Sequence, residues 1–185
     1  MANSEHLVIL KQGVVYWNNW RKNNPHVIPD LSNASMIGAE LKGINFEKAN
    51  LSYVDISGIA HLEIANFQKA DLRFANLSEA YLGGGDFTQA NLEHANLVEA
   101  ELICARIRDA SFMYANLASA NFNSTIMYDT IFCDANLIDA TFSDARLINV
   151  NFIGAKITEI NLRKARFASK VMMPDHTVFN LRRGS

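Results

Sequence analysis

A chain of 185 residues is long enough for one domain, and no stretch rich in proline, glycine and serine divides it. The hydrophobic content of 49% and the near balance of charge, 17 Lys and Arg against 19 Asp and Glu, exclude a disordered chain and a strongly basic nucleic-acid-binding protein. No stretch approaches the roughly 18 apolar residues of a membrane span, and the N-terminus lacks a signal-peptide pattern, so we expect a cytoplasmic protein.

The sequence of residues 1–28 predicts a helical cap at the N-terminal end of the domain. Ser4 is expected to cap the helix, with Glu5 in its first turn. The apolar stripe on one face of this helix, over residues 4–23, comprises Leu7, Leu10, Val14 and Trp17. Gly13 weakens the helix by up to about 1 kcal/mol, so packing against the region that follows would have to offset this cost.

Residues 29–169 carry a five-residue repeat. From Ala60 onward an alanine recurs every five residues with few exceptions, and a larger apolar residue follows two positions later. This larger residue occurs in 22 consecutive units that end at Phe167 and in six earlier ones, which makes 28 units. Ile56 and Leu62 are six residues apart, so we expect a one-residue bulge near residues 58–60.

A period of five fits neither an α-helix nor an ordinary strand, so the chain must bend once in each unit. In a unit such as Ala65-Asn66-Phe67, the small and the large residue would point inward around an outward Asn, and Asn or Asp would stabilise the corner. Four units would close a coil of about 20 residues, and about seven coils would stack at the spacing of about 4.8 Å found between paired strands. The fold class predicted is an all-β solenoid, a parallel β-helix with four sides.

The interior of this solenoid is expected to be filled by the large residues, which leaves no tunnel for a ligand. The core residues singled out are Leu62, Phe67, Leu72, Leu77, Phe112, Leu117, Phe132 and Leu137. Val150 and Ile160 stand at the small position, so local widening is expected there. On the outside, Asn76, Asn96, Asn116 and Asn136 recur at 20 residues and could form a ladder of stacked amides.

Residues 170–185 are expected to form a C-terminal cap or tail. The apolar residues available to cover the last coil or to meet a second subunit are Val171, Met172, Met173, Val178 and Phe179. A monomer and a homodimer through the C-terminal end therefore both remain open.

No catalytic, metal or cofactor site is predicted, so we expect the protein not to be an enzyme. The histidines, at positions 6, 26, 61, 94 and 176, never fall at metal-ligand spacing, and solvated surface positions are expected for them. Cys104 and Cys133 fall on different edges and are expected to be free thiols. The chain contains no GxSxG, HExxH, P-loop or GxGxxG motif.

Two surface features could serve a partner. Residues 71–144 hold 11 acids and 3 bases, net −8, whereas residues 145–170 hold six bases and one acid, net +5. The best acidic column at the 20-residue period comprises Glu79, Glu99, Asp139 and Glu159, with Ser119 interrupting it. The outward apolar residues include Ile138, Ile148 and Ile153, which could merge into a docking patch. A solvated face that keeps the rod soluble is the alternative for the acids.

The unit seen in Ala70-Asp71-Leu72 and Ala135-Asn136-Leu137 resembles the pentapeptide-repeat family over residues 29–169. The segments Trp17–Arg21 and Met173–Val178 are similar to those of cyanobacterial members. This resemblance implies a right-handed quadrilateral β-helix, without cofactor, that presents its surface to an unidentified protein partner. From the composition and the lack of a long apolar stretch, we expect no direct contact with nucleic acid or membrane.

Some members of that family imitate duplex DNA and bind type II topoisomerases such as gyrase, which is the alternative function. A duplex as long as the acidic segment, about 18 Å, carries about 11 charges, close to the number of acids here. The acids of this chain are spread over several edges, however, which favours the interaction scaffold.

Overall fold

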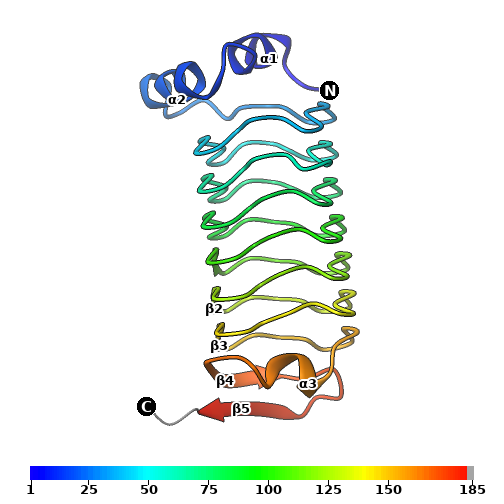
Figure 1. Cartoon of the computed structure of the whole chain (residues 1–185). Helices are drawn as coiled ribbons and strands as arrows, with labels where there is room; N and C mark the ends of the chain where they lie inside the picture. The colour runs from blue at the N-terminus through cyan, green and yellow to red at the C-terminus, as the bar shows by residue number, and fades with distance from the viewer. Residues whose placement is uncertain (183–185) are drawn as a thin grey trace.

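The computed structural model describes residues 1–182, which form a rod of stacked coils with two helices at one end and a β-hairpin at the other (Figure 1). In chain order the elements are α1 (Ser4–Leu10), α2 (Val14–Asn23), β1 (Arg106–Arg108), β2 (Ile126–Tyr128), β3 (Arg146–Ile148), α3 (Glu159–Leu162), β4 (Phe167–Met172) and β5 (Val178–Arg182). Within the described residues, no helix is both long enough and apolar enough to cross a bilayer.

Each five-residue unit pairs in parallel with the fourth unit after it in the chain. Single bridges join Asn76 to Asn96 and Asn116 to Asn136, so one coil takes 20 residues and has four sides. Bridges that span residues 56–60 join partners 21 apart, as between Asp55 and Asn76. The extra residue therefore lies in this segment, where Gly58 and Ile59 have φ values of 72° and 64°.

The corners are tight turns in which Asn or Asp holds the backbone. In one unit the Asn66 Oδ1 accepts the N–H of Gln68 at 3.0 Å, and the Ala70 N–H donates to the Phe67 carbonyl at 3.0 Å. Lys69, just before Ala70, has a φ of 58°, which is typical of a type II turn. The same side-chain bond to the N–H two residues on occurs in thirteen units. The corner role predicted for Asn and Asp is thus confirmed.

Large side chains fill the interior from one coil to the next. All eight of the core residues expected from the sequence have a relative exposure of 0%. Rings stack along the axis, with centroids 4.9 Å apart for Phe112 and Phe132 and 5.2 Å apart for Phe132 and Phe152. Val150 is buried at the small position as well. The axis of the rod is therefore packed with side chains.

The N-terminal segment forms two helices, where a single one was predicted over residues 4–23. Gly13, with a φ of 94°, lies between α1 and α2, because a residue without a Cβ adopts this backbone conformation without strain. The N-cap of α1 is Asn3, and the prediction of Ser4 is wrong. The Asn3 side chain accepts the N–H groups of Glu5 and His6. The helix boundary thus moves by one residue.

Side chains of the helices bind the open backbone edge of the first coil. The Trp17 Nε1 donates to the Asn45 carbonyl at 2.8 Å, and Asn18 accepts the Asn45 N–H at 2.8 Å. The Arg21 guanidinium donates to the Glu47 carbonyl at 2.8 Å. Such bonds satisfy backbone groups that would otherwise lack a partner at the end of the stack.

The repeat becomes irregular near its C-terminal end, and the prediction for this part is wrong in three places. Thr158 and Asn161 form a capping box that begins α3, so Glu159 and Ile160 belong to a helix and not to a five-residue unit. Ile160 is 72% exposed and does not widen the interior. In β4 the buried residue is Ala168, so Phe167 faces outward beside Arg146.

A β-hairpin ends the stack. Strand β4 pairs in parallel with β3 and antiparallel with β5, which is the terminal strand of the sheet. Val171 and Met173 are buried against the last coil, whereas Val178 is exposed. Of the C-terminal segment predicted at 170–185, residues 183–185 lie outside the described residues.

The inward and outward positions can be separated by paired substitutions. Leu117→Ala should lower the free energy of unfolding by about 2–5 kcal/mol, because it leaves a cavity in a packed interior. Glu99→Ala, on the outside, should change it by less than about 0.5 kcal/mol. Chemical denaturation measures both, and equal losses at the two positions would contradict the assignment.

Candidate interaction surface

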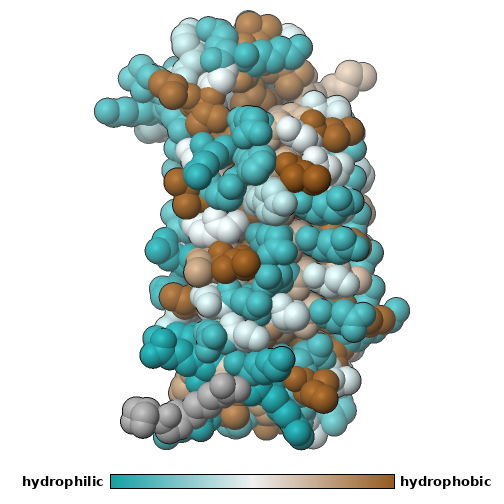
Figure 2. Space-filling view, in the orientation of Figure 1, coloured by the Kyte–Doolittle hydropathy of each residue, from teal (hydrophilic) through white to brown (hydrophobic). Residues whose placement is uncertain are grey.

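Because the coils stack in register, residues one coil apart lie above one another and form columns along the outside of the rod. Figure 2 shows apolar residues scattered among hydrophilic ones over the coils, without one continuous apolar patch on this face. Recognition by this face would therefore depend on the order of side chains along particular columns.

The predicted acidic column is shorter than expected. Glu79, Glu99 and Asp139 are exposed at equivalent corner positions, with φ values of 58° to 61°, and Ser119 interrupts them. Glu159 begins α3 and leaves the corner position, because the capping box replaces the turn there. The carboxylates thus form a pair of neighbours and one separate acid.

The three predicted apolar residues do not form one patch. Ile138 is 50% exposed, whereas Ile148 and Ile153 are half-buried, and the 20-residue register puts the three on different corners. Ile138 lines a shallow hollow of about 460 Å³ beside α3, together with Ile157 and Ile160. This hollow lies near the C-terminal end of the rod.

Amide hydrogen bonds join neighbouring coils in two places along the column that the sequence predicted. The Asn96 Nδ2 donates to the Asn76 Oδ1 at 3.0 Å, and the Asn136 Nδ2 donates to the Asn116 Oδ1 at 2.9 Å. Asn76 continues the ladder to the Asp55 carboxylate at 3.1 Å. Side-chain hydrogen bonds thus orient Asn76, Asn96 and Asn136, whereas Asn96 and Asn116 are joined by a backbone bridge.

An exposed aromatic ladder lies on a neighbouring corner and was missed from the sequence. Tyr53, Phe74, His94 and Tyr114 stack with centroids 4.8 to 4.9 Å apart and planes within 11° of parallel. Tyr53, Phe74 and Tyr114 are between 44% and 55% exposed. The signal was present, because these residues are 20 or 21 apart and each follows a core residue by two positions.

An ion pair stands beside this ladder. The Arg73 guanidinium donates to both oxygens of Asp71, at 2.6 and 2.8 Å, and this hydrogen bonding lowers the pKa of the Asp71 carboxyl. Both partners are partly exposed to solvent, so the pair orients Arg73 more than it stabilises the fold.

Among residues 1–182, Asp86 is the outward carboxylate with the most side-chain hydrogen bonds. Its oxygens accept from the Thr88 N–H and Oγ1, the Gln68 Nε2 and the Arg106 guanidinium, at 2.6 to 3.1 Å. Burial alone would raise the pKa of Asp86, but these hydrogen bonds together lower it. The carboxylate therefore fixes the position of Arg106 on the adjacent coil.

Within residues 1–182, no group of three or more His, Cys, Asp or Glu is arranged to hold a metal ion. Cys104 and Cys133 are free thiols, and burial, followed by the charge of Asp134, raises the pKa of Cys133. His6 is buried and its Nδ1 accepts the Asp30 N–H at 3.0 Å, so the solvated position expected for this histidine is wrong.

Comparison with family models identifies pentapeptide repeats, in eight copies, over residues 30–59, 60–84, 75–113 and 115–152. A comparison with curated protein sequences finds no match.

Several solved structures are similar to this chain. QnrB1, a plasmid-mediated fluoroquinolone resistance protein, is 14% identical over 77% of this chain and 81% of its own, with a TM-score of 0.45. A pentapeptide repeat protein from the thylakoid lumen of Arabidopsis thaliana is 27% identical over 71% and 70%, with a TM-score of 0.40. HetL, a protein from the cyanobacterium Nostoc involved in heterocyst differentiation regulation, is 22% identical over 81% and 87%, with a TM-score of 0.29.

Asp86→Asn should lower the free energy of unfolding at neutral pH by about 1 kcal/mol, since it weakens charge-assisted hydrogen bonds. The folded-state pKa of Asp86 lies below its ordinary value, so its contribution is present above about pH 4 and is lost as the pH falls through the folded-state pKa. Denaturant melts at several pH values should therefore show the difference from wild type shrinking in acid. Asp139→Asn is the exposed control, and a difference that grows in acid would contradict this account.

Proposed function

Because the chain belongs to the pentapeptide-repeat family, we propose that it is a non-enzymatic scaffold of the cytoplasm that binds a partner protein through its outer surface. The observation that carries this proposal is the packed interior, which leaves only the outside free for recognition. The family's architecture, a right-handed quadrilateral β-helix, gives that outside four sides.

The exposed columns are suited to binding because they are rigid. Backbone hydrogen bonds hold adjacent coils together, and the amide and aromatic ladders fix side chains along two columns. A partner would contact side chains repeated at about 4.8 Å along the rod. These side chains are already ordered, so binding would cost little conformational entropy. Rigidity of this kind favours specific recognition by a protein surface.

We also propose that the two ends have separate roles. Helices α1 and α2 would cap a stack of about seven coils formed by residues 29–169, since their side chains bind the edge of the first coil. At the other end, the free edge of β5 would be the contact in a homodimer, if the protein is not a monomer.

The alternative, a DNA-like inhibitor or protector of a type II topoisomerase, needs a continuous array of carboxylates. Glu79 and Glu99 are adjacent in their column, but Ser119 interrupts it and Glu159 lies in α3. Arginines occupy another side of the same rod, at Arg106 and Arg146. We therefore favour the scaffold over the DNA mimic.

A photo-cross-linking amino acid at each corner tests the scaffold. Placed singly at Cys104, Tyr114, Tyr128 and Glu99 in the full chain, it should capture the same protein from a cyanobacterial lysate on one or two corners only. The captured band should be displaced by excess unlabelled protein at micromolar concentration. Wild-type protein without the cross-linking amino acid is the control. No reproducible capture from any corner would contradict the proposal.

A gyrase supercoiling assay tests the alternative. We expect the protein, even at high excess over gyrase, neither to inhibit supercoiling nor to protect the enzyme from a fluoroquinolone, because its carboxylates do not reproduce the layout of phosphates. Inhibition at a low molar ratio would reverse the order of the two functions. Glu79→Gln with Glu99→Gln would then show whether those carboxylates are responsible.

A further inference from the structure

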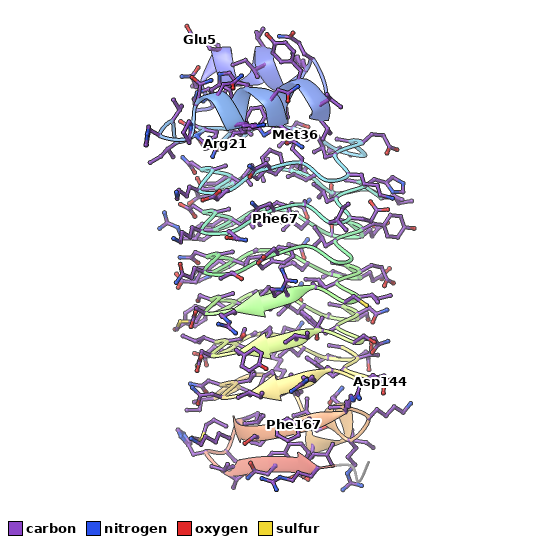
Figure 3. All side chains as sticks on the ribbon, turned by 90° about the vertical axis from the view of Figure 1, so that its left-hand side faces the viewer. Glu5, Arg21, Met36, Phe67, Asp144 and Phe167 are labelled. Atoms are coloured by element: carbon purple, nitrogen blue, oxygen red, sulfur yellow. The ribbon has the colours of Figure 1, made fainter. Side chains whose placement is uncertain are left out.

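The outer face of the sheet carries a row of alternating cationic and apolar side chains. The strand register aligns Arg106, Ile126, Arg146, Phe167 and Arg182 across β1 to β5, one residue from each strand. Figure 3 views this side of the rod, with the five strands lying one below another. The arginines are exposed, and Ile126 is 41% exposed. Phe167 is half-buried, so the arginines and Ile126 are the most accessible members of the row.

A second row flanks the first and reinforces its character. It aligns Arg108, Tyr128 and Ile148, and the Arg108 guanidinium lies 5.0 Å from the centre of the Tyr128 ring. Arginine and tyrosine are enriched at protein interfaces and among the residues that contribute most to binding. The two rows therefore combine positive charge with apolar surface, whereas a face that serves only to interact with solvent would be polar throughout.

The charge of this face favours an anionic partner. Arg106 already has a partner in Asp86, but among residues 1–182 no carboxylate lies within ion-pair distance of Arg146. Arg146 stands at the centre of the row between two apolar neighbours, Ile126 and Phe167. An acidic group bound at Arg146 would gain an ion pair without displacing one that exists.

The spacing of the row selects a helix over an extended strand. Arginines two strands apart are separated by about 9.6 Å, with an apolar residue midway at about 4.8 Å. On one face of an α-helix, residues seven apart are separated by about 10.5 Å, and residues three or four apart by about 5 Å. In an extended peptide, residues three apart span about 10 Å but point to opposite faces.

Nucleic acid fits this face less well than protein does. A sugar-phosphate backbone is bound mainly through cations, so Ile126 and Phe167, which alternate with the arginines, would have no apolar group of the ligand to pack against.

We propose that this row is the docking site for an acidic amphipathic helix of a partner protein, with carboxylates seven residues apart and apolar side chains between them. The inference rests on the scaffold function proposed above and names the surface and the chemistry of its partner. The helix would lie along the rod axis, across the strands. The row spans about 19 Å, which corresponds to about 13 helical residues.

Synthetic peptides test the spacing. The probe is a helix-stabilised peptide of about 16 residues with glutamates seven apart and leucines midway between them. Fluorescence anisotropy with the full-length protein should show saturable binding that weakens with salt. A peptide of the same composition in scrambled order should bind at least about tenfold more weakly, because its carboxylates do not match the arginines.

Substitutions in the protein test the surface. Arg146→Glu should weaken peptide binding at least about tenfold, and Arg146→Lys should retain most of it. Lys22→Glu, the same charge reversal at an exposed position in α2, at the opposite end of the rod, should change binding less than about twofold. Thermal melts identify any unfolded variant, and Arg146→Gln replaces Arg146→Glu if the latter does not fold.

Three results would overturn the proposal: no binding of the probe, equal binding of the scrambled peptide, or tighter binding of a single-stranded oligonucleotide that is lost in Arg146→Glu. Cross-linking separates this failure from that of the scaffold itself. Capture of a partner at Tyr114 or Glu99 but not at Tyr128 would support the scaffold function and contradict the docking row. Absence of capture at every position would contradict both proposals.

Discussion

Hydrogen bonding between consecutive coils governs the rest of this structure. Within one side, the Asn91 N–H donates to the Ala70 carbonyl of the preceding coil at 3.0 Å, while the Leu92 N–H donates to the Ser111 carbonyl of the next coil at 2.7 Å. Alternate residues thus pair with opposite neighbours, and the outward residue lies between two inward ones. Because a side is so short, the chain must turn after every unit, and the polar outward residue is also the one that stabilises the turn.

The repeat could be predicted because the interior accepts only apolar side chains at one position in five, and this requirement is visible as a period of five in the sequence. The structure differs from the prediction at both ends of the repeat, where local interactions of single residues decide the conformation. Gly13 breaks the predicted helix because its backbone is free to adopt positive φ, and Asn161 starts a helix by closing a capping box. Each of these local effects outweighs the periodic pattern over one turn of the chain. After the capping box, Ile160 is exposed and Phe167 faces outward.

The surface was less predictable than the interior because solvent imposes no common requirement on the outward residues. The aromatic ladder can be found only by comparing residues a full coil apart, and the extra residue near Gly58 moves Tyr53 out of the simple 20-residue count. The arginine row depends further on the shift that brings Phe167 beside Arg146 and on the antiparallel return of β5. Both arrangements follow from stacking, and each gives the rod a distinct side.

Four sides per coil also restrict how such a chain can change length. Loss of 20 residues from the middle brings equivalent units together again and shortens every column by one step. Loss of a single five-residue unit keeps the inward pattern intact, yet it rotates everything downstream by a quarter turn. His94 would then stand above a residue from another side, and the surface would be scrambled while the core still packed. Selection on the exterior would therefore preserve the coil, and not the single repeat, as the unit of insertion and deletion.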